Sequence, residues 1–290
     1  MDGSGPSAPQ GIGANRNPKP MSNPKPFRVI DAHAHIFPDK VAERAVQSIG
    51  GYYNLPMSGS GTVDGLIKSG EAMGVSHYLV HSTATRPEQV DAINAYISAT
   101  CAADSRLIGF GTLHPDVEDL PASFENLRGL GLKGIKLHPE FQNFNLDDAV
   151  MMPIYAIAEG KLPLLIHMGD ENRDSSTPER LANVLDRFPN LTVIAAHLGG
   201  YQMWEQAAEC LAGRRIYLDT SSSLAFMTPE AATALIRRHG ATKILFGTDY
   251  PMWLHQEELE RLHRLDLSDE ERERILWRNA AELLGLGIDD

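Results

Sequence analysis

Residues 27–36, FRVIDAHAHI, form a short run of apolar and β-branched residues that ends in two histidines separated by one alanine. A near-continuous apolar run of this kind is typical of a parallel strand that is covered on both faces. In an open, doubly wound sheet the first strand usually ends in a glycine-rich phosphate loop instead. The His-Ala-His ending therefore favours the other common arrangement of parallel strands, a closed barrel.

Similar apolar runs recur along the chain, and most are separated from the next by an amphipathic helical stretch. The predicted strands are Phe27–Ile36, Val75–Ser82, Arg106–Leu113, Leu132–Leu137, Pro163–Met168, Thr192–Leu198, Ile216–Thr220 and Lys243–Thr248. Helix starts are marked by Thr177-Pro178 and Thr228-Pro229, each an N-cap followed by proline, and by the capping box that begins at Ser268. Eight strand–helix units without a break predict an α/β fold, a single (β/α)₈ TIM barrel.

The chain divides into a tail, residues 1–26, and one predicted barrel domain, residues 27–290. The tail is rich in Gly, Pro, Ser and Asn and has few apolar side chains, so we expect it to be disordered. It has no apolar core of a signal peptide, and no segment of the chain is apolar enough for a membrane span. Two long loops, Phe37–Gly61 and His138–Val150, interrupt the barrel, and the first is a candidate lid or contact surface of a homo-oligomer.

Composition narrows the cellular setting and the partners. Cys101 and Cys210 are too few for a disulfide framework and are expected to be buried thiols in a reducing cytoplasm. The formal net charge of −12 argues against a nucleic-acid partner, which requires a basic face. We expect a small-molecule substrate and no membrane partner.

Most of the 11 histidines lie at predicted strand ends; only His77, His239, His255 and His263 do not. The carboxyl ends of the strands form the active-site face of such a barrel. Asp219 and Asp249 end the seventh and eighth strands. This concentration of imidazole and carboxylate on one rim predicts a metal site.

The first two histidines also have suitable spacing. Residues i and i+2 of a strand point to the same side, so His33 and His35 are both expected to enter the barrel mouth. Three protein ligands that include a carboxylate leave a coordination position open for water, and the metal lowers the pKa of that water to about 7. The sequence therefore predicts a catalytic centre.

The motifs VIDAHAHI, GIKLHP, LLIHMG, VIAAHLGG and ILFGTDYP together resemble the amidohydrolase superfamily, and most closely its amidohydrolase-related branch. That branch includes proteins similar to aminocarboxymuconate-semialdehyde decarboxylase. The resemblance runs from about Val29 to Leu286, with the motifs in the order of the family.

The resemblance implies a role for each of these residues. His33 and His35 match the ligand pair of the first strand, and His167 matches the ligand of the fifth. Asp249 matches the carboxylate that contacts both the metal and the attacking water. His197 matches a catalytic acid, base or electrophile in mononuclear members and a second-metal ligand in binuclear members.

The resemblance leaves the number of metal ions open. Lys136 lies near the position at which binuclear members bridge two metals with a carboxylated lysine, but it is equally a candidate for a buried ion pair with Asp31 or Asp219. We favour one divalent ion, Zn²⁺ first and Mn²⁺ or Fe²⁺ as alternatives. A second ion would be held by Lys136 and His197.

The first functional hypothesis is a metal-dependent hydrolase of a small amide, ester or lactone. In this reaction Asp249 accepts a proton from the metal-activated water, and His197 stabilises the developing oxyanion or assists the leaving group. The alternative is a metal-dependent decarboxylase, a lyase, of an aromatic or unsaturated carboxylic acid. A third hypothesis, a barrel that binds a ligand without chemistry, is disfavoured because every ligand position holds a competent donor.

Substrate contacts are expected from the loops. Arg86 and Arg173 are candidates to bind a substrate carboxylate, although exposed loop positions suit them as well. Candidates for other contacts are Gln142, Asn143 and Asn145 as hydrogen-bonding groups, Tyr52, Tyr53 and Trp253 as an apolar wall, and His114 and His138 as substrate or strand-end groups.

Overall fold

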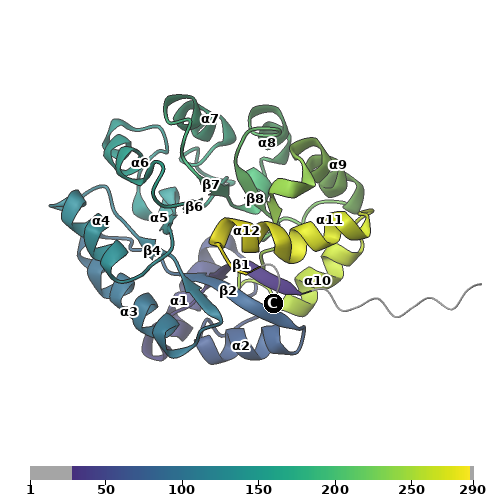
Figure 1. Cartoon of the computed structure of the whole chain (residues 1–290), viewed down its shortest axis with the longest axis horizontal. Helices are drawn as coiled ribbons and strands as arrows, with labels where there is room; N and C mark the ends of the chain where they lie inside the picture. The colour runs from purple at the N-terminus through teal and green to yellow at the C-terminus, as the bar shows by residue number, and fades with distance from the viewer. Residues whose placement is uncertain (1–27, 288–290) are drawn as a thin grey trace, which may run out of the picture.

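The computed structural model describes residues 28–287, and in this part of the chain strands and helices alternate around a closed barrel (Figure 1). The tail predicted for residues 1–26 lies outside the described residues. The strands are β1 (Val29–His35), β2 (Val75–His81), β3 (Leu107–Gly109), β4 (Gly111–Thr112), β5 (Ile135–Leu137), β6 (Leu164–Ile166), β7 (Val193–Ala195), β8 (Tyr217–Asp219) and β9 (Ile244–Leu245). The predicted TIM barrel is confirmed.

All neighbouring strands pair in parallel, in the orders β1-β2-β3 and β4-β5-β6-β7-β8-β9. β3 and β4 are one predicted strand that is interrupted at Phe110, whose N–H donates to Val80 O across a distance of 2.9 Å. The ring closes where β1 meets the segment after β9: Ala34 bridges Tyr250, and Ala32 N donates to Phe246 O at 2.8 Å. Closure brings the two predicted ligand segments, at the first and last strands, side by side.

Helices surround this ring (Figure 1). They are α1 (Asp39–Tyr53), α2 (Val63–Glu71), α3 (Val90–Ala103), α4 (Leu120–Gly129), α5 (Pro139–Gln142), α6 (Met152–Ala158), α7 (Pro178–Arg187), α8 (Trp204–Cys210), α9 (Pro229–His239), α10 (His255–His263), α11 (Asp269–Glu273) and α12 (Asn279–Leu284). Short 3₁₀ segments are η1 (Pro87–Gln89), η2 (Ala149–Met151), η3 (His197–Gly199) and η4 (Ala241–Lys243), and η5 (Arg274–Arg278) is a π-helical turn.

The predicted helix starts agree with the structure. The hydroxyls of Thr177 and Thr228 accept hydrogen bonds from the backbone N–H groups three residues later, and each is followed by proline in the first turn. Ser268 and Glu271 form the expected capping box at the start of α11. These caps satisfy N–H groups that the first helical turn leaves without partners.

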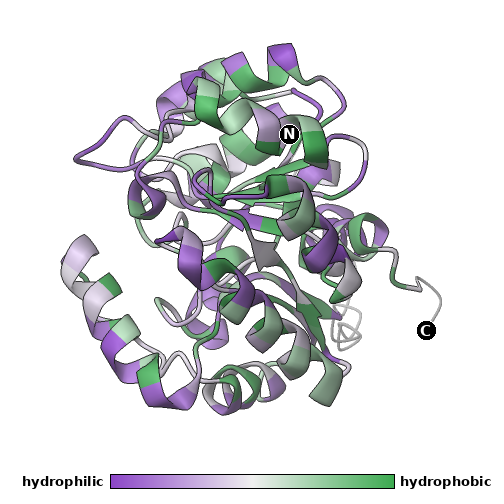
Figure 2. Ribbon diagram, turned by 90° about the vertical axis from the view of Figure 1, so that its left-hand side faces the viewer, coloured by the Kyte–Doolittle hydropathy of each residue, from purple (hydrophilic) through white to green (hydrophobic). Residues whose placement is uncertain are grey.

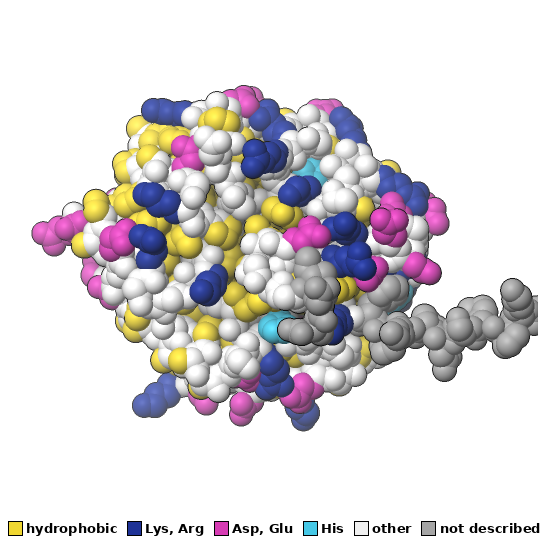
Figure 3. All heavy atoms as spheres, viewed as in Figure 1, with side chains coloured by type: hydrophobic (Ala, Val, Ile, Leu, Met, Phe, Trp, Pro, Cys, Tyr) yellow, Lys and Arg dark blue, Asp and Glu magenta, His cyan; other side chains and the backbone are white. Residues whose placement is uncertain are grey.

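The core has two parts. A large cluster lies between the strands and the surrounding helices, and a smaller one fills the barrel interior and includes Ile30, Leu79, Phe110 and Leu165. Trp277 and α12 pack on the smaller cluster and cover one end of the barrel (Figure 1). Apolar residues accordingly gather on the strands and inner helix faces (Figure 2), and charged side chains of both signs surround the end that α12 covers (Figure 3).

The segment Phe37–Gly61, interpreted from sequence as a loop, contains the helix α1. Only Ala42 and Gly50 of this helix are buried, so it lies on the barrel rather than within its core. Between residues 28 and 287, none of the helices combines the length and the apolar character that crossing a bilayer requires.

Candidate metal centre and substrate cavity

The histidine pair of β1 and Asp249, which follows β9, bring three potential ligand atoms together in the barrel mouth. Nε2 of His33 and Nε2 of His35 lie 3.4 Å apart, and Oδ1 of Asp249 lies 3.4 Å from the first and 3.3 Å from the second. Atoms bound at about 2.1 Å to a tetrahedral ion lie roughly 3.4 Å from one another, so this triangle has the right size for a zinc-type ion. Two imidazoles and a carboxylate are also a suitable donor set.

The ring of His33 is oriented by Asp219 at the end of β8. Nδ1 of His33 donates to Oδ2 of Asp219 across 2.9 Å, which leaves the lone pair on Nε2 pointing to the triangle. Burial and the neighbouring Lys136 ammonium hold the pKa of His33 well below its ordinary value, so the ring is neutral. A carboxylate that fixes the tautomer of an imidazole in this way is a common feature of metal sites.

His167 and His197 form a second pair of facing donors. Nδ1 of His197 lies 3.0 Å from the carbonyl oxygen of Ser221, and Nε2 of His167 lies 2.9 Å from that of Gly169, so each of these nitrogens must carry the proton. The remaining nitrogens, His167 Nδ1 and His197 Nε2, both have lone pairs and lie 3.0 Å apart. Two lone pairs at this distance are stable only with a cation or proton between them.

His167 is therefore brought to the same mouth as the triangle but contacts His197 rather than the β1 pair. A small cavity of about 30 Å³ is lined by His35, His167 and Asp249 together. The ligand set predicted from sequence thus converges on one face, with His33, His35 and Asp249 in mutual contact.

The electrostatics of Asp249 keep its carboxylate ionised, which suits a metal ligand. Burial would raise its pKa, but the hydrogen bond from His35 and the nearby His197 and His35 rings hold the pKa at about 2. Its backbone φ is 58° and that of His197 is 59°, a left-handed conformation that few side-chain-bearing residues adopt. Such backbone geometry is frequent at functional sites and aims both side chains into the mouth.

Lys136 lies inside the barrel beside this centre. Its Nζ is 3.2 Å from Nε2 of His33, and burial lowers its pKa to about 8 although Asp249 and Asp219 oppose the shift. Among the residues described, no carboxylate oxygen lies within 4.0 Å of this ammonium, so the expected ion pair with Asp31 or Asp219 does not form.

Asp31 has a different role from those considered in the sequence. Its Oδ1 accepts hydrogen bonds from the backbone N–H of His33 and of Thr248, both at 3.0 Å, and its Oδ2 accepts one from the Thr248 hydroxyl at 2.6 Å. This buried carboxylate therefore fastens the first strand to the last and supports both ligand segments through their backbone.

A second polar cluster borders the centre after β5. Nδ1 of His138 lies 3.4 Å from Oε2 of Glu140, and the His138 ring stacks on the His167 ring with centroids 3.9 Å apart. Burial raises the pKa of Glu140 to about 6. The hydroxyl of Tyr53, from α1, lies 3.3 Å from His138 Nε2 and 3.4 Å from His167 Nε2. α1 thereby reaches His138 and the predicted ligand His167.

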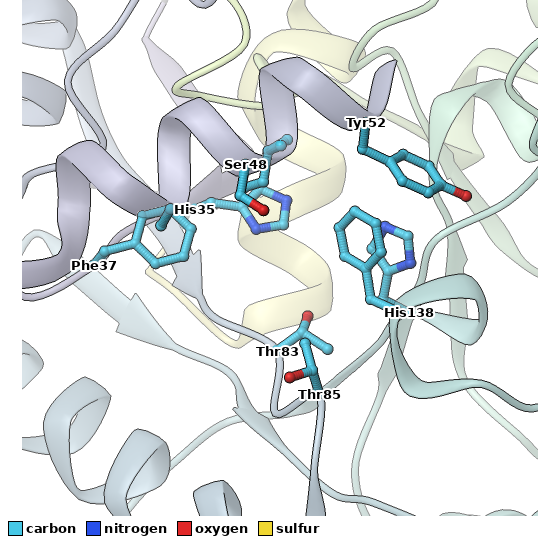
Figure 4. Close-up of a pocket in the computed structure, with 10 residues that line it drawn as sticks. His35, Phe37, Ser48, Tyr52, Thr83, Thr85 and His138 are labelled. Carbon is cyan, nitrogen blue, oxygen red and sulfur yellow. The ribbon is translucent and has the colours of Figure 1, made fainter. Parts of the chain in front are cut away.

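A cavity of about 540 Å³ opens from the metal centre toward α1 (Figure 4). In the figure, His35 and His138 face it from two sides, Phe37 and Tyr52 stand at its edges, and Thr83 lies at its lower edge. The complete lining is His35, Phe37, Ala45, Ser48, Ile49, Tyr52, Thr83, Thr85, His138 and Phe141. It is therefore largely apolar and aromatic, with hydroxyl groups at two opposite edges: Ser48 and Tyr52 at one, Thr83 and Thr85 at the other.

Several predicted substrate contacts have structural roles instead. Gln142 donates to Ala84 O at 2.9 Å and to Leu113 O at 2.7 Å, so it joins strand ends. Nδ1 of His114 accepts from Asp116 N at 3.2 Å.

The remaining candidates divide between the cavity and the surface. Asn143 caps the end of α5 with its backbone in the left-handed conformation, and the backbone N–H of Asn145 donates a hydrogen bond to Oδ2 of Asp148. Trp253 packs against Arg261 and Phe226 outside the cavity, whereas Tyr52 lines it. Arg86 and Arg173 are exposed loop residues.

Four residues have contacts in the site that the sequence did not predict. Asp219 was considered only as a partner of Lys136, His138 as a substrate or strand-end group, and His81 as a strand-end residue; the strand-end position was the available signal. Glu140 carried no signal, because its contact with His138 depends on the short helix α5.

Comparison with known proteins finds a family match and curated relatives. A family model described as Amidohydrolase matches residues 30–286. Two curated relatives are 2-amino-3-carboxymuconate-6-semialdehyde decarboxylases. The Caenorhabditis elegans protein is 28% identical over 142 residues, which is 43% of this chain and 35% of the relative. The Dictyostelium discoideum protein is 27% identical over 226 residues, 62% of each chain. The chain thus spans less than two thirds of either relative.

Among solved structures, a dihydroxybenzoic acid decarboxylase from a Polaromonas species has a TM-score of 0.65. It is 15% identical, with 89% of this chain and 97% of that chain covered, and its structure holds manganese and the inhibitor 2-nitroresorcinol. At this identity the similarity establishes the fold alone.

Proposed function

Because this chain belongs to the amidohydrolase family, whose model spans residues 30–286, we propose that it is a metal-dependent decarboxylase of a small aromatic or unsaturated carboxylic acid. The curated relatives are named as decarboxylases, which favours this activity over the hydrolysis expected first from the sequence. The family membership itself makes the chain an amidohydrolase-type enzyme.

The observation that carries the proposal is the position of the aromatic cavity directly beside the three-donor centre. His35 belongs to both, and Phe37 and Phe141 give the cavity flat apolar walls. Such walls suit an unsaturated ring or chain, while a cation at the centre suits an acid group. An acid with its carboxylate toward His35 and its carbon frame toward Phe141 uses both features.

We assign the ion to His33, His35 and Asp249, with His167 as the further predicted ligand. A bound divalent ion would supply Lewis acidity at the substrate carboxylate or a neighbouring oxygen. One Zn²⁺ remains the first expectation, and Mn²⁺ is supported by the manganese in the Polaromonas structure. A second ion at Lys136 and His197 is the alternative.

The chain's own residues would then handle substrate and proton. Decarboxylation breaks the bond from the substrate carbon to the carboxyl carbon, and CO₂ leaves. The electron pair stays on the substrate carbon until that carbon accepts a proton. This proton is drawn from solvent, and we assign its relay to Asp249 and His197, which face the same mouth; the aromatic side chains limit the access of further water.

Hydrolysis is the second candidate, and the ionised state of Asp249 favours it. With a pKa held at about 2, this carboxylate is ionised, so it is free to take a proton from a water that a bound metal would make more acidic. A lactone or amide would then be the substrate, with His197 next to the developing oxyanion.

The test measures metal content and reaction type on the same preparation. Elemental mass spectrometry of protein purified without chelator should find about one equivalent of divalent metal per chain, lost in His33→Ala. Hydroxybenzoic and unsaturated acids are then assayed for CO₂ release, and lactones and amides for hydrolysis. Exposed His263→Ala is the matched control and should keep its metal.

Release of CO₂ that requires His33 would support the decarboxylase. Hydrolysis without CO₂ release would replace it with the second candidate, and two equivalents of metal would assign Lys136 and His197 as ligands. Protein that binds no divalent metal even after reconstitution would refute both activities.

A further inference from the structure

His81, the last residue of β2, is a buried imidazole that the proposed chemistry does not use. Its side chain is fully shielded from solvent, and neither of its ring nitrogens has a hydrogen-bond partner within the described chain. An imidazole always carries at least one N–H, and burying both nitrogens without partners is costly. The missing partner is expected to come from outside the chain.

The position of His81 identifies where that partner lies. Its ring centroid is 4.4 Å from that of His35 and 4.9 Å from that of His33, with the ring planes strongly inclined. One of its nitrogens lies within 4.8 Å of a ligand nitrogen of each. An oxygen atom bound to an ion at His33 and His35 would therefore lie near His81 and accept a hydrogen bond of about 2.8 Å from it.

The chain beyond His81 continues to the cavity. Side chains alternate along an extended segment, so His81 and Thr83 are expected on the same side. Thr83 lines the cavity between His35 and His138 (Figure 4), and its buried hydroxyl also has no partner among the described residues. The end of β2 therefore presents two unpaired polar groups, one beside the centre and one beside the cavity.

We propose that His81 donates a hydrogen bond to the substrate carboxylate oxygen that faces the metal centre, and so fixes the rotation of that carboxylate. This inference rests on the proposed function, because it takes the substrate to be an acid. Contact of one oxygen with the ion alone leaves the carboxylate free to turn about its bond to carbon, whereas a directed hydrogen bond from His81 to the same oxygen restricts that rotation. The plane of the carboxylate decides whether the electron pair of the breaking bond can enter the unsaturated system.

Binding of benzoate to the manganese-loaded protein tests this role without turnover. His81→Phe keeps a planar ring but has no donor, and His81→Gln keeps a donor. We expect calorimetry to show benzoate bound roughly 10- to 100-fold more weakly by His81→Phe and near wild-type strength in His81→Gln, because a hydrogen bond to a charged group has about this effect. Manganese content should be unchanged in both variants.

The matched control is His77→Phe, which makes the same substitution on β2 but at the opposite end of the strand. It should leave benzoate affinity unchanged. Circular dichroism and thermal unfolding establish that each variant folds. Should His81→Phe not fold, His81→Leu replaces it, because leucine also has no hydrogen-bond donor and this variant should bind benzoate weakly.

The outcomes separate this inference from the proposed function. Unchanged benzoate affinity in the folded His81→Phe or His81→Leu would overturn it, and so would loss of manganese, which would make His81 a metal ligand. Wild-type protein that does not bind benzoate at millimolar concentration would also overturn it. If the expected pattern holds but no acid releases CO₂, the proposed function fails while His81 remains a carboxylate-binding residue.

Discussion

Gly247 lies directly behind His33, and this contact makes the metal centre sensitive to a single methyl group. A Cβ built on Gly247 would lie 2.9 Å from Cβ of His33 and 3.3 Å from Cβ of Ser221. Both neighbours are fixed close to the backbone and cannot turn away, so His33 would have to move.

We therefore predict that Gly247→Ala weakens metal binding by about 10- to 100-fold, the usual effect of disturbing the support of a ligand. Competition with a fluorescent chelator measures the affinity. Gly129→Ala is the matched control, since its added Cβ meets no atom within 4 Å. Equal metal affinity in the two variants would contradict a tight contact behind His33.

The ligand residues themselves were accessible from the sequence, because strand ends and i, i+2 spacing fix which residues face the barrel mouth. The hydrogen-bond partners of the buried charged residues around them could not be predicted from the sequence. Asp31 and Asp219 were both candidate partners of Lys136 from the sequence, whereas in the structure Asp219 accepts from the His33 ring and Asp31 accepts from backbone N–H groups. Such choices depend on side-chain rotamers and on register between distant strands, which no local pattern encodes.

At the scale of an element, α1 determines the shape of the substrate cavity. It supplies Ser48, Ile49 and Tyr52 to the larger cavity, and Ile49 also lines the smaller cavity beside Asp249. The side chain at position 49 therefore stands between the opening and the centre.

Replacing Ile49 with tryptophan should fill this passage. We predict that Ile49→Trp raises KM, or the Kd of a bound acid, by at least about 10-fold, because the indole takes the volume of the ligand. Metal content should stay the same. Val41→Trp puts the same ring on the exposed side of α1, where Val41 is 47% exposed, and should change neither quantity. A normal KM in Ile49→Trp would mean that substrate enters by another route.

α1 also explains why the sequence predicted a loop here. A helix that packs on a core shows an apolar stripe at helical spacing, but α1 buries only Ala42 and Gly50. Its sequence includes Gly50-Gly51, which lowers helix propensity. The helix is stabilised by contacts at the barrel mouth, such as Tyr52 with Asp170 at 2.9 Å, and these join distant segments.

At the scale of the whole molecule, the barrel follows from pattern alone because each unit repeats the same signal. Eight apolar runs with intervening amphipathic stretches are compatible with few folds other than a closed barrel, once the first run is seen to lack a glycine-rich phosphate loop. The ring of strands closes, however, through the contacts of β1 with Phe246 and Tyr250. Trp277 and α12 then cover one end of the barrel interior. These contacts link the two ends of the described chain.

One buried acid in this outer layer should affect the stability of the entire fold. Glu258 of α10 has no side-chain exposure, and although Arg261 contacts Oε1, Oε2 has no partner among the described residues. Burial raises the pKa of Glu258 to about 8, against the opposing effect of Arg261. Between its ordinary pKa and this value, the folded state binds more protons than the unfolded state. The free energy of unfolding therefore falls as pH rises through that window.

Glu258→Gln removes this dependence, because the amide stays neutral and resembles the protonated acid. We predict little change in the free energy of unfolding at pH 5 and a gain of about 1 to 3 kcal/mol at pH 9, where wild-type Glu258 must be ionised in the interior. Urea denaturation at both pH values measures the difference. Glu260→Gln, at an exposed position of the same helix, should shift stability equally at both. A Glu258→Gln gain that is the same at pH 5 and pH 9 would show that Glu258 is already ionised in the fold at low pH.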